Sequence, residues 1–199
     1  MKRSNAATGA ALWRDGWYRH AGRRVSPNFG PRPPPARVDL IVLHCISLPP
    51  GEFGGDAVER FFCNQLDWAQ HPYFRSIEGL QVSSHFYIRR HGELLQFVSA
   101  DDRAWHAGVS SYRGRGNCND YSIGIELEGV AGGLFESCQY ETLAALCAAI
   151  SQRHGVTDIV GHEHIAPDRK DDPGAGFDWL RLRQNLGFAV PFPPSAGAP

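Results

Sequence analysis

Residues 38–45, with the sequence VDLIVLHC, are the segment that most constrains the fold. The run is short and almost unbroken in its apolar character. Such runs are typical of a strand in the middle of a sheet, covered on both faces. A strand of this kind needs a packing layer on each side, so the segment predicts a sheet enclosed between two layers.

The rest of the central chain alternates between strand and helix periodicities. Strands are predicted over residues 82–90, 93–99, 122–128 and 158–160. The dipeptide His91-Gly92 predicts a hairpin between the first two. Helices are predicted over residues 56–68, 137–154 and 177–186, with Asp56 and Ser137 as N-caps and Gly155 as the terminator of the second. The pattern predicts a single α/β domain with a central mixed β-sheet flanked by helices.

The two ends of the chain differ in composition from its centre. Residues 1–37 are rich in Gly, Pro and Arg and predict an extended lead-in that wraps the domain. Residues 38–188 are predicted to form the domain itself, and residues 189–199 a disordered tail.

Charge and cysteine content narrow the function classes. The formal net charge is −1, which argues against a nucleic-acid partner held by bulk charge. No apolar stretch is long enough to cross a membrane, and no secretory signal is found at the N-terminus. The five cysteines are odd in number and form no CxxC pair, which favours free thiols and a cytoplasmic location. Among 20 basic side chains only Lys2 and Lys170 are lysines, so the internal lysine suggests a need for an ammonium.

Histidines follow two of the predicted strands. His44 lies at the end of the first strand, and His162 follows the last one in the segment GHEHIAPDRKDDPG, residues 161–174. A catalytic zinc site uses three nitrogen or oxygen ligands and keeps one position open for water. The two histidines and one downstream aspartate would supply it, with the choice open among Asp168, Asp171 and Asp172. If strand geometry continued past His162, His164 would share its face and compete as a ligand. The simpler interpretation of His44 is a hydrogen-bonded histidine in the core. The simpler interpretation of residues 161–174 is a polar surface loop.

Two further segments carry candidate functional groups. In the strand 121–129, Gly124, Glu126 and Glu128 share the face opposite the apolar residues, so that face either lines a site or is exposed to solvent. Gly124 leaves room beside Glu126 for a substrate or another backbone. The loop 103–110 contains Trp105 and His106, and the tryptophan suits a platform for a sugar ring or an apolar ligand. A tryptophan that only anchors its loop is the alternative.

Taken together, these segments resemble a known family. The strings VLHCISLPPGEFGG, SSHFYIRR, RAWHAGVS, CNDYSIGIELEG and GHEHIAPDRKDDPG are similar to those of the N-acetylmuramoyl-L-alanine amidases of the amidase_2 type, relatives of the peptidoglycan-recognition proteins. The similar segments span residues 38 to about 183, nearly the whole predicted domain.

The resemblance implies a site and an activity. It implies one Zn²⁺ ion held by His44, His162 and Asp172, with Glu126 rather than Glu128 activating water and Lys170 stabilising the transition state. It places Trp105 and His106 in the substrate cleft and gives His85 and His164 supporting or packing roles. The expected reaction is hydrolysis of the amide between the lactyl group of (1,6-anhydro-)N-acetylmuramic acid and L-alanine, in peptidoglycan recycling. The expected protein is a cytoplasmic monomer that acts on anhydromuropeptides, without a nucleic-acid or membrane partner.

The chain departs from the family pattern at four positions. Cys45 stands where members usually have Asn, Gln81 and Asn117 where basic residues are common, and His164 where Asp is usual. The first three bear on substrate preference rather than on the reaction. The alternatives considered are a zinc-free binding module, an envelope amidase acting on intact murein, and a cysteine hydrolase using Cys45. The last is disfavoured because Cys45 should face away from His44 on the same strand.

Overall fold

The central sheet of the computed structural model, which describes residues 12–191, has six strands. Their order is β12 (Asp158–Gly161), β5 (Leu40–Ile46), β11 (Ser122–Glu128), β6 (Phe86–Ile88), β7 (Leu94–Gln96) and β3 (Gly22–Arg23). The first four strands run parallel and β7 is antiparallel to β6, so the sheet is mixed as predicted. The apolar run at 38–45 therefore forms an interior strand, with a neighbour on each side.

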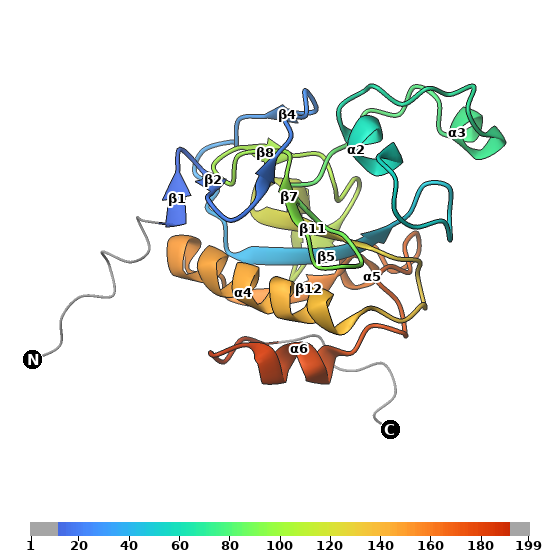
Figure 1. The fold of residues 1–199 in the computed structure, drawn as a ribbon. Helices are drawn as coiled ribbons and strands as arrows, with labels where there is room; N and C mark the ends of the chain where they lie inside the picture. The colour runs from blue at the N-terminus through green and yellow to red at the C-terminus, as the bar shows by residue number, and fades with distance from the viewer. Residues whose placement is uncertain (1–11, 192–199) are drawn as a thin grey trace, which may run out of the picture.

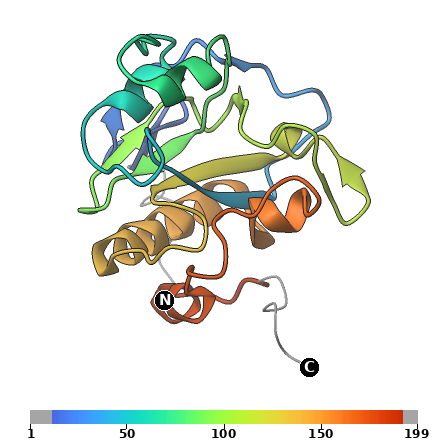
Figure 2. The same ribbon diagram turned by 90° about the vertical axis from the view of Figure 1, so that its right-hand side faces the viewer.

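Helices cover both faces of this sheet (Figures 1 and 2). On one face lies α4 (Ser137–His154), with α6 (Trp179–Asn185) packed outside it; on the other lie α2 (Ala57–Phe62) and α3 (Pro72–Ser76). The short helix α5 (His162–Ile165) follows β12 directly, and the 3-10 helix η1 (Cys118–Asp120) precedes β11. The predicted α/β architecture is confirmed.

Side-chain alternation along β5 separates two environments. Ile41 and Leu43 are fully buried against the α4 side of the sheet. Leu40 and Val42 point the other way and pack with Ala107 and its neighbours. His44 shares this second face, because side chains two apart in a strand lie on the same side. His44 therefore lies on the side of the sheet that α4 does not cover.

Element boundaries differ from prediction where local caps decide them. The helix predicted over 56–68 ends at Phe62, since Asn64 adopts a left-handed conformation with φ of 56°. The helix over 137–154 is found, but its N-cap is Glu136 rather than Ser137, and Gly155 ends it with φ of 69°. The last helix covers 179–185, where Asp178 accepts a hydrogen bond from the backbone N–H of Arg181 at 2.9 Å.

The N-terminal region contributes short strands to the domain. Among its described residues, β1 (Trp13–Arg14) pairs with β2 (Trp17–Tyr18), β3 extends the central sheet, and β4 (Phe29–Gly30) pairs with β8 (Arg103–Ala104). A further hairpin joins β9 (Ser111–Tyr112) to β10 (Arg115–Gly116). Residues 1–11 of the predicted lead-in and 192–199 of the predicted tail lie outside the described residues.

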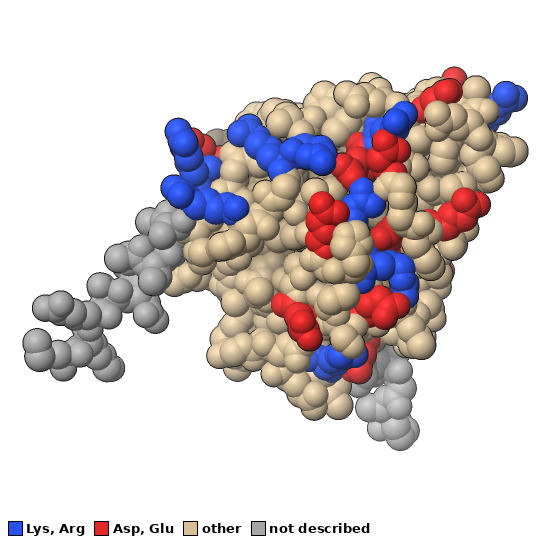
Figure 3. All heavy atoms as spheres, viewed as in Figure 1, with Lys and Arg blue, Asp and Glu red and all other residues tan. Residues whose placement is uncertain are grey.

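Charges of both signs lie beside one another on the face shown in Figure 3. Elsewhere among the described residues, ion pairs such as Arg153–Asp101 and Arg115–Asp39, each at 2.6 Å, join charges of opposite sign. In the part of the chain that the structure describes, no helix has both the length and the apolar character needed to cross a membrane.

Candidate metal centre and active-site cleft

Three side chains converge at the ends of β5 and β12. The Nδ1 atom of His44 lies 3.0 Å from Nδ1 of His162 and 3.2 Å from Oδ2 of Asp172. Nδ1 of His162 lies 3.3 Å from Oδ1 of Asp172. All three residues are buried, and together they form a group that could hold a metal ion.

The fold positions each of these residues through its backbone. His44 lies on the buried strand β5, and His162 is the first residue of α5, directly after β12. Two backbone hydrogen bonds hold the loop that bears Asp172. The Asp172 carbonyl accepts from the backbone N–H of Glu163 at 3.0 Å, and the Pro173 carbonyl accepts from the backbone N–H of Gly132 at 3.2 Å. Residues 174–176 pack closely on residues 132–133: a Cβ on Gly176 would lie only 2.1 Å from the Gly133 carbonyl oxygen.

The three side chains offer imidazole nitrogens and carboxylate oxygens, which suit a metal cation that prefers nitrogen and oxygen ligands. The Nε2 atom of His162 lies 3.2 Å from the carbonyl oxygen of Ala107, which can only accept, so this nitrogen carries the proton. Nδ1 of His162 then offers its lone pair to the centre of the group. Two imidazole nitrogens and one carboxylate are a typical ligand set of catalytic zinc sites.

Electrostatics keeps His44 and Asp172 in the protonation states that a metal requires. Burial lowers the pKa of His44 to about 4, although the close contact with Asp172 partly opposes this shift. Burial alone would raise the pKa of Asp172, but its close contacts with His162 and His44 outweigh this effect and bring that pKa below its usual range. At neutral pH the site therefore contains a neutral His44 and an ionised Asp172, as metal binding demands.

Glu126 lies next to this group without belonging to it. It is the register partner of His44 across β11 and β5, and only 9% of its surface is exposed. Its Oε2 atom is buried without a hydrogen-bond partner. Burial raises the pKa of Glu126 well above its usual range, the charge of Asp172 raises it further, and Lys170 partly opposes both. An unpartnered buried carboxylate oxygen of this kind is able to accept a proton from a bound molecule.

The competing ligand candidates lie elsewhere. The condition under which His164 would share the face of His162 is not met, because α5 begins at His162 and helical residues two apart do not face each other. The His164 ring instead accepts the backbone N–H of Gly161 at 2.9 Å and contacts Trp179 edge-on. Asp168 and Asp171 are both exposed. Of the three aspartates left open by the sequence, only Asp172 joins the two histidines.

A cleft of about 610 Å³ opens over the site. Its lining includes the three candidate ligands together with Trp105, Glu126 and Lys170. Largely apolar residues from α2 and from residues 73–82 complete the lining. Trp105 is half-buried, so part of its ring surface is open to a ligand.

Two predicted positions have surroundings that sequence reasoning did not anticipate. His106 borders the cleft, but its two ring nitrogens contact His44 and Ser122. The Glu128 carboxylate accepts backbone N–H groups of Arg90 and Gly54 instead of facing solvent. Ser122 was not predicted as a residue of this region. It lies two residues before Gly124 and four before Glu126, which places it on the same face of the strand.

Cys45 faces away from His44 as predicted. It packs against the core on the α4 side of the sheet. Burial raises the pKa of its thiol above the ordinary value, and the charge of Glu126 raises it further. Both effects disfavour the thiolate that a nucleophilic cysteine needs.

Comparison with known proteins identifies the class of protein to which this fold and this buried group belong. The family model described as N-acetylmuramoyl-L-alanine amidase matches residues 34–175, and the chain belongs to this family. It is 50% identical over 171 residues to the 1,6-anhydro-N-acetylmuramyl-L-alanine amidase AmpD of Citrobacter freundii, covering 85% of this chain and 91% of the relative.

Solved structures agree with this assignment. A crystal structure of an AmpD derivative has 48% identity and a TM-score of 0.85, covering 88% of this chain and 99% of the other. The amidase AmiD of Escherichia coli, solved in complex with anhydro-N-acetylmuramic acid-L-Ala-D-γ-Glu-L-Lys, has 27% identity and a TM-score of 0.55, covering 89% of this chain and 66% of the other. The predicted fold class and amidase family are confirmed.

Proposed function

We propose that the protein is a zinc-dependent amidase that hydrolyses the bond between the lactyl group of 1,6-anhydro-N-acetylmuramic acid and the L-alanine of the stem peptide. The substrate follows from the relatives, since those at about 50% identity are named for this reaction. The observation that carries the proposal is the convergence of His44, His162 and Asp172 beside the unpartnered carboxylate of Glu126. Peptidoglycan recycling is the process that this activity would serve.

Zinc is the proposed metal, with one ion held by Nδ1 of each histidine and by the carboxylate of Asp172. When bound, it would supply Lewis-acid chemistry that polarises a carbonyl and lowers the pKa of water towards about 7. Residues of the chain itself orient the site, because the Ala107 carbonyl holds His162 and the loop contacts hold Asp172.

Glu126 is proposed as the general base and then the general acid. Its carboxylate would take a proton from the water that attacks the lactyl carbonyl carbon. The same proton would pass to the nitrogen of L-alanine as the carbon–nitrogen bond breaks. The products are a lactyl carboxylic acid on the sugar and a free amine on the peptide. A raised carboxyl pKa suits a group that must hold a proton between two steps.

Lys170 and Trp105 are proposed to act on the substrate. Both line the cleft beside the candidate ligands. The ammonium of Lys170 would stabilise the negative charge that develops on the carbonyl oxygen, an effect whose removal typically costs about 100- to 1,000-fold in rate. The half-exposed ring of Trp105 would support the sugar. His106 also lines the cleft, but its two ring nitrogens contact His44 and Ser122, so neither is free to bind the substrate.

The proposed place of action is the cytoplasm. All five cysteines lie within the described residues and none is in a disulfide. Free thiols of this number are typical of a reducing compartment. Cell fractionation with detection of the native protein tests this point.

One assay decides the reaction. Anhydromuramyl-tripeptide is offered to the zinc-loaded protein, to the same protein after chelation, and to Glu126→Ala. We expect release of the free peptide only with the first, and undiminished turnover in either of the others would refute the assignment. Polymeric murein as a parallel substrate separates a recycling amidase from an envelope amidase, and metal analysis of the purified protein separates both from a zinc-free binding module.

A further inference from the structure

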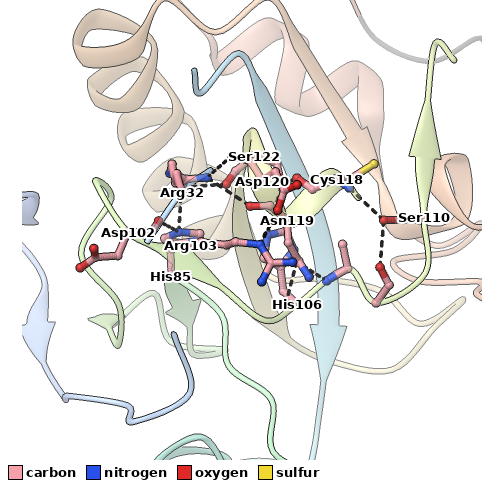
Figure 4. A network of polar contacts seen from close by, with 12 residues as sticks. Arg32, His85, Asp102, Arg103, His106, Ser110, Cys118, Asn119, Asp120 and Ser122 are labelled. Atoms are coloured by element: carbon pink, nitrogen blue, oxygen red, sulfur yellow. Dashed lines mark hydrogen bonds and ion pairs between the residues drawn. The ribbon is translucent and has the colours of Figure 1, made fainter. Parts of the chain in front are cut away.

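The ring of His44 has a second contact, on the side away from the candidate ligands. Its Nε2 atom lies 2.9 Å from Nδ1 of His106, and the two rings meet edge to face. Nε2 of His106 lies 3.2 Å from Oγ of Ser122, and that oxygen lies 2.6 Å from the carbonyl oxygen of Cys118 (Figure 4). A continuous chain of polar contacts therefore links His44 to a backbone carbonyl at the start of η1.

The backbone carbonyl at the end of this chain of contacts favours one direction for each hydrogen bond in it. A carbonyl oxygen only accepts, so the Ser122 hydroxyl donates its one proton to Cys118. The Ser122 oxygen must then accept from Nε2–H of His106. A neutral imidazole has a single N–H, so Nδ1 of His106 is an acceptor and Nε2–H of His44 donates to it. Nδ1 of His44 is thereby left with its lone pair directed towards His162 and Asp172.

Among the described residues, no carboxylate faces the ring of His106. The groups that face its ring are His44, His85 and the hydroxyl of Ser122, none of which is negatively charged.

Gly124 makes the space for the His106 ring. A Cβ at this position would lie 2.4 Å from Cγ of His106, closer than any real contact. The ring thus lies against the bare backbone of β11. Ser122, Gly124 and Glu126 occupy alternate positions of this strand and share one face. Ser122 contacts a ring nitrogen of His106, and Gly124 leaves room for the ring.

We propose that His106 is a positioning residue: held by Ser122 and admitted by Gly124, it fixes the tautomer of His44 and so presents Nδ1 of that ring to the metal. The inference rests on the proposed zinc site. Such outer hydrogen bonds fix the orientation and basicity of a ligating imidazole, and losing one typically weakens metal binding about 10- to 100-fold.

The first test reads the tautomers in the metal-free protein. Nitrogen-15 NMR of histidine-labelled protein distinguishes protonated from unprotonated ring nitrogens, and the His106→Asn spectrum assigns the signals. We expect both His44 and His106 to carry the proton on Nε2. A proton on Nδ1 of either ring overturns the proposal, whatever the metal affinity.

The second test measures the zinc dissociation constant by competition with a chelator. We expect it to rise about 10- to 100-fold in His106→Leu, which removes the acceptor, and to recover in large part in His106→Asn, whose amide oxygen can occupy the place of Nδ1. Ser122→Ala and Gly124→Ala should weaken zinc binding without altering a ligand or His106 itself. If His106→Leu does not fold, these two variants test whether His106 positions His44. Unchanged affinity in folded variants overturns the proposal.

Ser84→Ala is the matched control. Ser84 is as deeply buried as Ser122, but its hydroxyl has no hydrogen-bond partner. Removing it should leave zinc affinity unchanged, and an equal loss in Ser84→Ala would overturn the specific role of Ser122. If the wild-type protein bound no zinc, the proposed function would fail, while the NMR measurement would still decide the tautomer of His44.

Discussion

Glu126 lies directly opposite His44 in the parallel pairing of β11 with β5. The proposed proton-transfer group and a candidate metal ligand are therefore held side by side by backbone hydrogen bonds. Both residues are buried, and neither is carried by a flexible loop. A site built on neighbouring strands is held more rigidly than one built on loops, which suits chemistry that depends on small distances.

Replacing Glu126 with Gln should separate catalysis from metal binding. The variant retains the three candidate ligands but loses the proton acceptor, so we expect kcat to fall about 100- to 10,000-fold with one zinc still bound. Steady-state kinetics and metal analysis check this. Metal-free Glu126→Gln should also resist denaturation better at neutral pH, because the buried charge of Glu126 is removed.

Glu128→Gln is the control on the same strand face. Its carboxylate holds the backbone N–H groups of Arg90 and Gly54, so the change should lower the free energy of unfolding by about 1 to 3 kcal/mol. Turnover by the folded fraction should stay near wild type. An equal loss of kcat in both variants would contradict the assignment of Glu126.

Lys170→Arg should keep the positive charge and still lose most of the rate. A compact ammonium can approach a developing oxyanion as a point charge, whereas the planar guanidinium is larger and fixed in shape. We expect kcat to fall by up to about 100- to 1,000-fold, as in Lys170→Ala. Full activity in Lys170→Arg would mean that only charge matters at this position.

Removing the metal should abolish turnover and lower the melting temperature together. Zinc that binds only the folded protein stabilises it by mass action, so both losses should be reversed when zinc is restored. Asp172→Asn should lose tight zinc binding, because it replaces a carboxylate ligand with a neutral amide. Asp171→Asn, one residue away and exposed, should retain it. Calorimetric titration with zinc compares the two variants.

Acid should destabilise the metal-free protein between pH 6.5 and about 4. Burial lowers the pKa of His44 and His154 to about 4 and holds those of His85 and His106 well below their ordinary value. In this pH window the unfolded chain binds protons that the folded chain does not, so stability falls as pH falls. Each fully buried histidine contributes up to about 1.4 kcal/mol per pH unit. Urea unfolding at several pH values, with His85→Gln showing a shallower slope, checks this.

Arg32 should be among the most important side chains for stability. Its guanidinium donates to the carbonyls of Asn119, Asp120, Ser122 and Ala100 at 3.1 to 3.4 Å (Figure 4). Arg32→Ala would leave these acceptors without a donor, so we expect a loss of about 2 to 4 kcal/mol in the free energy of unfolding. Arg14→Ala, at an exposed position, should change it by less than about 0.5 kcal/mol.

Much of the fold could be predicted because its strands and long helix obey simple periodicities. The apolar run at 38–45 and the alternation in 122–128 both became interior strands, and α4 has the predicted bounds. Helix ends were harder, because they depend on local backbone conformations such as the left-handed Asn64. The ligand set required the family resemblance, since three aspartates satisfied the same spacing argument.

The contacts behind the site could not be predicted from local patterns. His164 stayed open as a rival ligand because a local pattern does not show that the strand geometry stops at Gly161, where one helical turn redirects the side chain. His106 meets His44 only because the chain returns through a loop, so no spacing rule links the two. Arg32 reaches the same region from the N-terminal segment through contacts nearly 90 residues away in sequence. Such contacts depend on tertiary packing rather than on periodicity.

The order of the sheet has a consequence for how the protein matures. β5, β11 and β12 are neighbours in space but come from distant parts of the chain, and Asp172 follows the last of them. During synthesis an emerging chain carries His44 early but cannot surround an ion until nearly the whole domain has been made and paired. Pairing between distant segments is slow compared with local helix formation. Loading of the proposed metal would therefore be a late event in biogenesis, possible only once the sheet has formed.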